Sequence, residues 1–264
     1  MIVPIRLSYL VLLCASLMTV QQAWAGAVED ARVAYLRKDY STALSLWRPL
    51  AEQGNAEAQR GLGILYENGR AVAKDGKLAT DLFRKAALGG DAEAEYRFGL
   101  RLVMGTDDVA RDTAEGLNWL VKSGEHGHFN SFTRIGDIYR IGKYGLAKDL
   151  VQATSWFRKA ADLGDPEGQA WLGWAYHYGM GIPQDANGAV SWLTKAGEHG
   201  YTPAQMELGE IFERGDGVGV DKPKALCWYR KVKSDFPSAQ AIVSAAVARL
   251  ELEITSGASE AHCD

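Results

Sequence analysis

Histidines are the side chains in this sequence whose spacing comes closest to a catalytic or metal-binding pattern. His126 and His199 both stand in the sequence Gly-Glu-His-Gly, and His126 and His128 form a His-x-His pair. Such a pair can supply two ligands to a zinc ion, but no cysteine or pair of carboxylates stands near it in the sequence to complete the site. A nucleophilic site would also need a base and a group that orients it. We therefore predict no catalytic residue, no metal and no cofactor.

Other chemistry-bearing patterns are weaker still. His262 lies beside Cys263 and Asp264 at the end of the chain. The Gly-x-Gly sequences at Gly179 and Gly215 have no preceding strand, which a phosphate-binding loop requires. The formal net charge is -4 and no basic block occurs, which excludes the basic patch of a nucleic-acid-binding protein.

The two copies of Gly-Glu-His-Gly belong to a wider repeat that organises the chain after residue 26. Four series of residues recur in step every 36 or 37 positions, which indicates an array of similar structural units. The series are Gly63, Gly99, Gly136, Gly173 and Gly209; Gly69, Gly105, Gly142, Gly179 and Gly215; Asp75, Asp112, Asp149, Asp185 and Asp221; and Leu82, Trp119, Trp156, Trp192 and Trp228.

Each unit is predicted to hold two helices, helix A and then helix B. In the first unit Ala58, Leu62 and Tyr66 are spaced by four, as on one helix face. A glycine inside a helix costs about 0.5–1 kcal/mol relative to alanine, so Gly63 and its repeats imply close approach of helix B. The small residues expected opposite them are Ala79, Gly116, Ala153, Ala189 and Ala225.

The remaining series mark the helix ends and the space between repeats. The second glycine series suits the left-handed residue that ends a helix A. The aspartates suit the N-caps of helices B. The strict register of the tryptophans predicts core or repeat-interface residues rather than a ladder for stacking a ligand.

Both ends of the array are predicted to be capped, because a repeat buries its apolar face only against its neighbours. Segments 28–38 and 40–52 read as an N-terminal hairpin whose second half matches a helix B. After Pro237 a helix over 238–253 is expected, with Ile242, Ala246 and Leu250 on its buried face. The predicted boundaries are 26–54 for the N-terminal cap, 55–90, 91–127, 128–164, 165–200 and 201–236 for five repeats, and 237–264 for the C-terminal helix and tail.

Residues 1–25 have the pattern of a secretory signal peptide. Arg6 precedes a 14-residue apolar run, and Ala23-Trp24-Ala25 offers a small-x-small cleavage site. The run is shorter than the roughly 20 residues of a membrane-spanning helix, although a retained anchor is the alternative. We expect a mature chain from Gly26 that is exported. Its two cysteines, Cys227 and Cys263, either pair in an oxidising compartment or leave Cys227 free and buried.

The repeats resemble the Sel-one-like repeat family, a branch of the tetratricopeptide superfamily. The tetratricopeptide pattern L-G-x-x-Y and A-x-x-x-F recurs in modified form. In the first unit it reads Leu62-Gly63-Tyr66 with Ala79 and Phe83, and its longer internal turn is typical of the Sel-one-like variant. The resemblance implies an all-α fold, a right-handed α-α solenoid of about five hairpins with capping helices. One bacterial branch carries a disulfide in each repeat and is linked to β-lactam binding, but this sequence lacks those cysteine pairs.

A helical-repeat stack offers an extended concave surface, which helix A lines in tetratricopeptide relatives. The side chains off the Leu-Gly-Tyr face are therefore expected to meet a partner, and the fourth unit stands out because its aromatic residues are not shared by the other repeats. The alternative is that some of these aromatic residues pack against the adjacent repeat. The predicted partner-binding residues are Arg60, Ile64, Glu67, Tyr96, Leu100, Arg140, Trp171, Trp174, His177, Tyr178 and Glu210, with Val103, Thr133, Asp137, Met206 and Glu213 on the same surface.

By this resemblance we expect a non-enzymatic protein-protein interaction scaffold or regulator in the bacterial periplasm. Its partner would be an exported domain of a membrane sensor or an envelope assembly component. Two other classes remain open: a β-lactam- or peptidoglycan-active envelope enzyme, and a carbohydrate-binding module that uses surface aromatic residues. No nucleic acid and no stable membrane insertion after cleavage are expected.

Overall fold

The computed structural model describes residues 26–233 and 237–256, and the predicted leader lies outside them. All regular structure in the described residues is helical, with no strand among them, which confirms the all-α prediction. Within the same residues, no helix is both long and apolar enough to cross a membrane.

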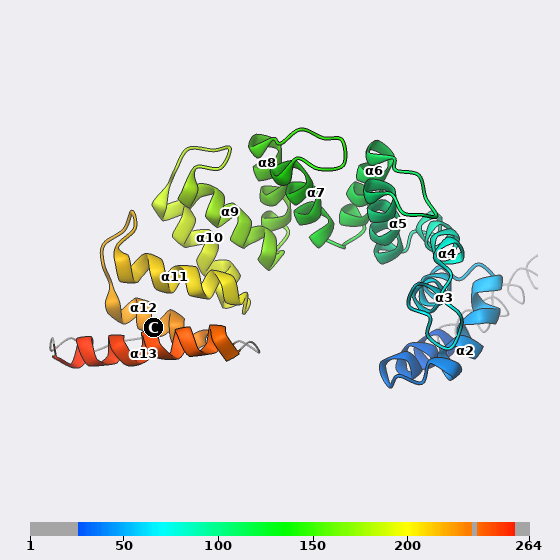
Figure 1. Cartoon of the computed structure of the whole chain (residues 1–264), viewed down its shortest axis with the longest axis horizontal. Helices are drawn as coiled ribbons and strands as arrows, with labels where there is room; N and C mark the ends of the chain where they lie inside the picture. The colour runs from blue at the N-terminus through cyan, green and yellow to red at the C-terminus, as the bar shows by residue number, and fades with distance from the viewer. Residues whose placement is uncertain (1–25, 234–236, 257–264) are drawn as a thin grey trace, which may run out of the picture. The chain divides into compact units, whose positions relative to one another are not determined.

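The helices follow one another as the repeat predicts (Figure 1). Residues 26–36 are helical and precede α2 (Tyr40–Glu52). The chain ends in the long helix α13 (Pro237–Ser256). Between them lie α3 (Ala56–Asn68), α4 (Gly76–Leu88), α5 (Ala92–Met104), α6 (Thr113–Glu125), α7 (Asn130–Ile141), α8 (Leu150–Asp162), α9 (Pro166–Tyr178), α10 (Ala186–Glu198), α11 (Thr202–Arg214) and α12 (Lys222–Lys231).

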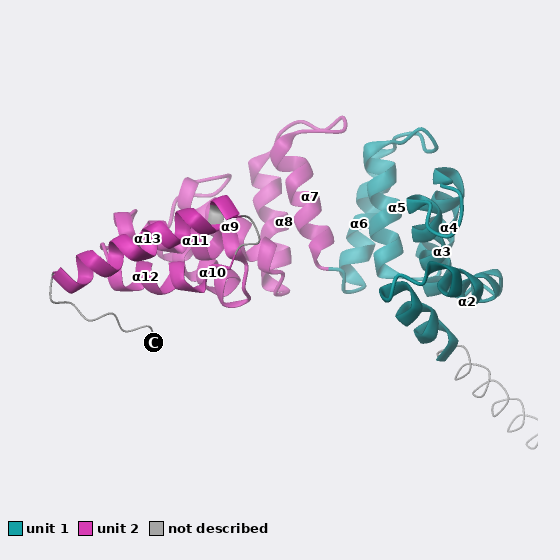
Figure 2. Cartoon of the chain, turned by 60° about the horizontal axis from the view of Figure 1, so that its bottom comes forward, with its two compact units in different colours: residues 1–128 teal, residues 129–264 magenta. Residues whose placement is uncertain are grey.

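The chain divides into two compact units, which Figure 2 draws in teal and magenta. Unit 1 runs to His128 and holds α2 to α6, whereas unit 2 begins at Phe129 and holds α7 to α13. Within each unit, every helix packs against the next one in the chain. Odd-numbered helices α3 to α11 are the helices A, and even-numbered helices α4 to α12 are the helices B.

The aspartate series caps the helices B as predicted. In α4, the Asp75 carboxylate accepts a hydrogen bond from the Leu78 backbone N–H at 2.9 Å. Asp112, Asp149, Asp185 and Asp221 make the same bond in their repeats. Since each cap satisfies an N–H that the helix leaves unpaired, the turn between the two helices of a hairpin is set locally.

The second glycine series ends the helices A. Gly69 and its four repeats all have positive φ, between 65° and 76°. Four of them close the helix in the left-handed conformation, and each donates its N–H to the carbonyl four residues earlier. The predicted C-caps are confirmed.

Close approach of helix B explains the glycines inside the helices A. A Cβ added to Gly63 would lie 2.6 Å from the Phe83 ring, and one added to Gly173 would lie 2.7 Å from Leu193. The predicted cause is thus confirmed, although the nearest atoms in most repeats belong to the large residue one turn after the predicted alanine. These residues are Phe83, Phe157, Leu193 and Tyr229, whereas at Gly99 the nearest atom is the Gly116 carbonyl oxygen.

The hairpin of α5 and α6 is the tightest, because here both helices carry glycine. A Cβ on Gly116 would lie 2.7 Å from the Gly99 carbonyl oxygen and 2.8 Å from the Val103 backbone nitrogen. Backbone atoms cannot turn aside as a side chain can. Gly116, which departs from the alanine of the other repeats, therefore reflects a backbone contact.

The C-terminal helix α13 packs on α12 through Ala246 and Leu250, as predicted, but not through Ile242. Val243, Leu250 and Ile254 are buried with Leu226 and Tyr229 of α12. Ile242, placed on the buried face from the sequence, is 65% exposed, so that prediction was wrong. Apolar residues stand at both 242 and 243, so the sequence does not show which of them is buried. The packing on α12 buries Val243.

The structure describes the state of one of the two cysteines. Cys227 on α12 is disulfide-bonded, so the alternative of a free thiol there was wrong. Cys263 lies outside the described residues.

Restoring the repeat's alanine at position 116 should weaken the fold. We expect Gly116→Ala to lower the free energy of unfolding by up to about 2 kcal/mol in urea denaturation. Overpacking costs about 1–3 kcal/mol, and the better helix propensity of alanine offsets only about 1 kcal/mol. Gly219→Ala is the control, because nothing lies within 4 Å of its added Cβ. A Gly116→Ala protein more stable than the parent would contradict the backbone contact.

Candidate protein-binding site

The His-x-His pair meets two carboxylates of α5 that sequence reasoning missed. His126 Nδ1 lies 2.9 Å from a carboxylate oxygen of Glu95, and His128 Nε2 lies 2.9 Å from one of Glu93. Burial raises the pKa of Glu93, but the hydrogen bond from His128 and the positive charge of Arg97 outweigh burial and lower it overall. The sequence signal for these two carboxylates is the pattern Glu-x-Glu, which has the same alternation as the His-x-His pair.

These four residues do not form a metal centre. No group of three or more His, Cys, Asp or Glu side chains suited to a metal ion occurs in the part of the chain that the structure describes. Each imidazole instead lies against a carboxylate, so the pairs join the end of α6 to α5.

His199 shows the same role in its own repeat. It lies at the end of α10, with Nδ1 3.2 Å from the side-chain oxygen of Gln169. The Gln169 amide donates in turn to the Ala161 carbonyl. Gln59 and Gln205 make the equivalent bonds to Ala51 and Gly197. The prediction that the repeated Gly-Glu-His-Gly marks a shared turn agrees with this geometry.

In unit 1, ion pairs cover much of the predicted helix A surface. Arg60 Nε donates to Asp91 at 3.0 Å, and Glu67 pairs with both Arg97 and Arg101, at 3.2 and 2.8 Å. Ile64 packs on the cluster around Phe83, Tyr96 stacks on His128 at 4.6 Å, and Leu100 is half-buried. The sequence analysis did not predict Arg97 and Arg101 as residues of this surface. They could have been found because they lie on the next helix A, which faces Glu67.

In unit 2, aromatic rings join neighbouring repeats. Trp171 stacks on Phe157 of α8 at 5.2 Å, and the Arg140 guanidinium lies 4.2 Å from the centre of the Trp171 ring. Trp174 meets Trp171 edge-on at 4.9 Å and packs on the cluster around Leu208. Trp171 and Trp174 thus pack against adjacent repeats, the alternative that the sequence left open.

His177 and Tyr178, at the end of α9, meet α11. Their rings lie edge to face at 4.5 Å. The Tyr178 hydroxyl donates to Glu207 at 2.7 Å, and His177 Nε2 lies 4.0 Å from the same carboxylate. Burial, the hydrogen bond to Glu207 and nearby carboxylates raise the pKa of Tyr178 to about 12. The residue Tyr178 is nevertheless 57% exposed.

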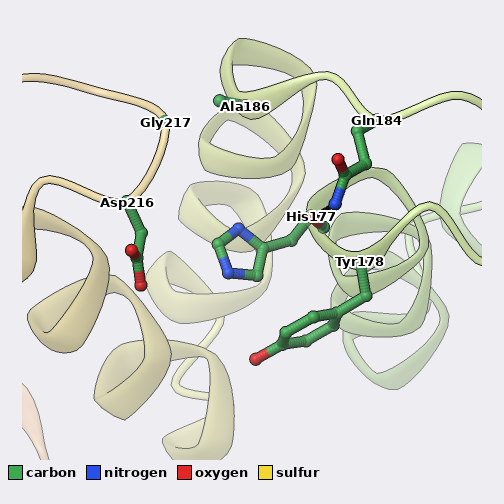
Figure 3. A pocket seen from close by; sticks show the side chains of 6 residues that line it. All are labelled: His177, Tyr178, Gln184, Ala186, Asp216 and Gly217. Atoms are coloured by element: carbon green, nitrogen blue, oxygen red, sulfur yellow. Dashed lines mark hydrogen bonds between the residues drawn. The ribbon is translucent and has the colours of Figure 1, made fainter.

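A pocket of about 330 Å³ opens beside these two residues (Figure 3). Its lining comes from the end of α9, the loop to α10, and the loop after α11. The His177 ring points toward the loop that carries Asp216, and the Tyr178 and Gln184 side chains lie on its other side. The other lining residues are Ala186 and Gly217.

The structure corrects two members of the predicted surface. Val103 and Thr133 are 0% and 1% exposed and cannot meet a partner. Val103 packs against Gly116, and the Thr133 hydroxyl lies 2.6 Å from Asp165 at the next repeat. Among the other surface residues, Asp137 pairs with Arg140, Glu210 with Arg214 and Glu213 with Arg249, while Met206 packs near α12.

The tryptophan series packs both between repeats and within hairpins. Trp119 packs on the cluster around Phe83 of the preceding repeat, and Trp228 lies against Gly197 of the preceding repeat. Trp119 meets Phe98 and Trp156 stacks on Phe132, each within its own hairpin. Four lysines, each three residues after a tryptophan, lie over the indole rings of Trp119, Trp156, Trp192 and Trp228. Half-buried rings covered by lysines fit the packing role that the register predicts.

Comparison with protein families identifies the repeat. The family model of the Sel1 repeat matches residues 33–55, 56–91, 92–128, 133–165, 166–201 and 202–231. Five of these segments overlap the five predicted repeats. The first covers α2, whose sequence matches a helix B.

Two solved structures have the same fold. A Sel1 repeat protein from Oxalobacter formigenes is 30% identical, with a TM-score of 0.67, and the match covers 77% of this chain and 82% of that one. A protective antigen of uropathogenic Escherichia coli with an SLR fold is also 30% identical, with a TM-score of 0.69 over 87% of this chain and 49% of that one.

The curated relatives are matched over short stretches. An uncharacterized protein of Neisseria meningitidis is 32% identical over 147 residues, which are 56% of this chain and 30% of the relative. A putative ERAD-associated E3 ubiquitin-protein ligase component of Schizosaccharomyces pombe is 33% identical over 80 residues, 30% of this chain and 11% of the relative. The chain thus spans less than a third of the length of either relative.

The repeat comparison predicts that glutamine is better than glutamate at position 95. Glu95 is 2% exposed and occupies the position of Gln59, Gln169 and Gln205. We expect Glu95→Gln to raise the free energy of unfolding by about 0.5–1.5 kcal/mol at neutral pH, because its amide can donate to the Ala87 carbonyl.

The matched control is Glu93→Gln, which removes the half-buried partner of His128. It should leave stability unchanged or lower it by less than about 1 kcal/mol. Urea denaturation of both variants checks the pair. A loss of stability in Glu95→Gln would mean that the His126 ion pair outweighs the hydrogen bond to the carbonyl.

Proposed function

Because this chain belongs to the Sel1 repeat family, we propose that it is a non-enzymatic scaffold or regulator of the cell envelope. It binds a protein partner through the helix A surface of unit 2. Sel1 repeat proteins bind other proteins, and the relatives include components of ERAD-associated E3 ubiquitin-protein ligases. The partner class we favour is an exported domain of a membrane sensor or an envelope assembly component.

One observation carries the choice of surface: the end of α9 exposes a large aromatic side chain beside a pocket. Tyr178 is 57% exposed, and its hydroxyl is held by Glu207. Aromatic residues held in place in this way are common anchors of protein interfaces. In unit 1, by contrast, Glu67, which holds the repeat position of His177, is paired with Arg97 and Arg101 within the chain.

The histidines add little support for an enzyme. His126, His128 and His199 hold helix ends through carboxylate or amide partners. Such pairs fit a structural role, in keeping with a scaffold.

The proposed location in the envelope rests on the sequence of residues 1–25, which has the pattern of a signal peptide. If the chain is exported and processed, intact-mass analysis of the protein isolated from its native envelope should give a mature chain that begins at Gly26. A chain that keeps residues 1–25 would contradict cleavage and favour a retained anchor.

The proposed surface can be tested by quantitative affinity capture from native envelope extracts. Proteins captured by the tagged parent should be reduced at least about tenfold by Tyr178→Ala, because the exposed ring is lost from an interface anchor. Val151→Ala is the control, since Val151 is 64% exposed on a helix B of the same unit.

Both variants must keep the parent's unfolding midpoint. Equal capture by the parent, Tyr178→Ala and Val151→Ala would show that the partner does not use the end of α9. The absence of any protein enriched over a tag-only control would contradict the scaffold function itself.

A further inference from the structure

The pocket at the end of α9 has the size and walls to receive one side chain. Its volume is about 330 Å³, the lower end of the range of ligand-binding pockets. The His177 and Tyr178 rings form one side, and Asp216 on the loop after α11 stands across from them (Figure 3).

The electrostatics of the pocket favour a positive charge. Asp216 is exposed in the lining, and Glu207 accepts the hydrogen bond of the Tyr178 hydroxyl. The pocket also lies at the carboxyl ends of α9 and α11, where the helix dipoles favour cations. The pKa of Tyr178 is raised first by burial and then by Glu207, Glu210 and Asp216, which agrees with a negative potential at its hydroxyl.

In unit 1, arginine makes the corresponding contact between neighbouring helices A. Glu67 on α3 and His177 on α9 hold the same repeat position, four residues after the glycine inside helix A. Arg97 on α5 and Glu207 on α11 also share a position, two residues before that glycine. Between α3 and α5, the chain itself places Arg97 and Arg101 on Glu67. Between α9 and α11, the acid is instead Glu207, and it faces His177 and Tyr178.

The exposed Tyr178 ring favours arginine over lysine. A guanidinium is planar, stacks on aromatic faces and binds a carboxylate through two parallel hydrogen bonds. The same chemistry occurs elsewhere in this chain. The Arg140 guanidinium lies 4.2 Å from the Trp171 ring centre, and that of Arg70 lies 4.9 Å from the Tyr40 ring centre.

We propose that the pocket formed by His177, Tyr178 and Asp216 receives an arginine side chain of the protein partner. The guanidinium stacks on the Tyr178 ring and donates hydrogen bonds to Asp216. This inference rests on the proposed protein-binding function and names the partner's contact residue.

The probe is an acetylated and amidated glycine pentapeptide with a central arginine. The chain has five histidines, so labelling histidine at Cε1 with ¹³C gives few NMR signals, and the His177 signal is identified by its loss in His177→Gln. We expect the arginine peptide to shift the His177 signal saturably while the His199 signal stays in place. Asp216→Asn should weaken binding roughly tenfold, the size expected for a charge-assisted hydrogen bond.

Two controls make the outcome specific. A peptide with citrulline in place of arginine keeps the shape without the charge and should not bind measurably; a lysine peptide should bind more weakly than the arginine peptide. Glu198→Gln removes an exposed carboxylate at the end of α10 and should leave binding unchanged.

The inference is overturned if the arginine peptide does not shift the His177 signal, if citrulline binds equally well, or if Glu198→Gln weakens binding as much as Asp216→Asn. Failure of the proposed function is a separate result. If peptide binding fails while Tyr178-dependent capture persists, only the arginine contact is wrong. If the peptide binds but no protein is captured, the scaffold function is wrong and the pocket takes a cation of another source.

Discussion

The close contact between the two helices of each hairpin is the constraint on which the rest of the structure depends. At Gly63, Gly136 and Gly209 the partner helix brings an aromatic ring to within 2.6 Å of where a Cβ would stand. This contact sets the separation and register of helices A and B. The aspartate N-caps and left-handed glycines then fall at fixed places in the turn. Since each unit repeats the same local solution, the binding surface is built from whatever residues the fixed register leaves outside.

Most of the fold could be predicted because its signals are local and repeated. A capping aspartate or a left-handed glycine acts within a few residues, so Asp75 and Gly69 can be read from the sequence alone. The first buried residue of α13 could not, because apolar residues stand at both 242 and 243. The choice of Val243 depends on Leu226 and Tyr229, a contact between two helices. Gly116 is a similar case: the sequence shows a departure from alanine, but only the backbone of α5 explains it.

The candidate site was predicted in outline and corrected in detail. A helix A contacts its own helix B and also the neighbouring hairpins. Some residues that lie off its Leu-Gly-Tyr face are therefore buried, and fewer positions remain exposed to a partner than the sequence suggests. Val103 and Thr133 are lost to those contacts. Glu207 and Asp216 were missed for the complementary reason, since they belong to the next repeat. They become relevant only when α9 and α11 are placed side by side, and no pattern within one repeat reports that.

The two units use the contact between neighbouring helices A in opposite ways, and this difference separates stability from function. In unit 1, Glu67 is neutralised by Arg97 and Arg101, and these half-buried pairs join α3 to α5. In unit 2, Glu207 stands at the repeat position of Arg97 and holds Tyr178, which remains exposed. An ion pair completed within the chain leaves little for a partner to add, because a new contact must first break it. A carboxylate-lined pocket beside an exposed ring leaves that contact to be made by another molecule, which is why the surface of unit 2 is the better candidate for recognition.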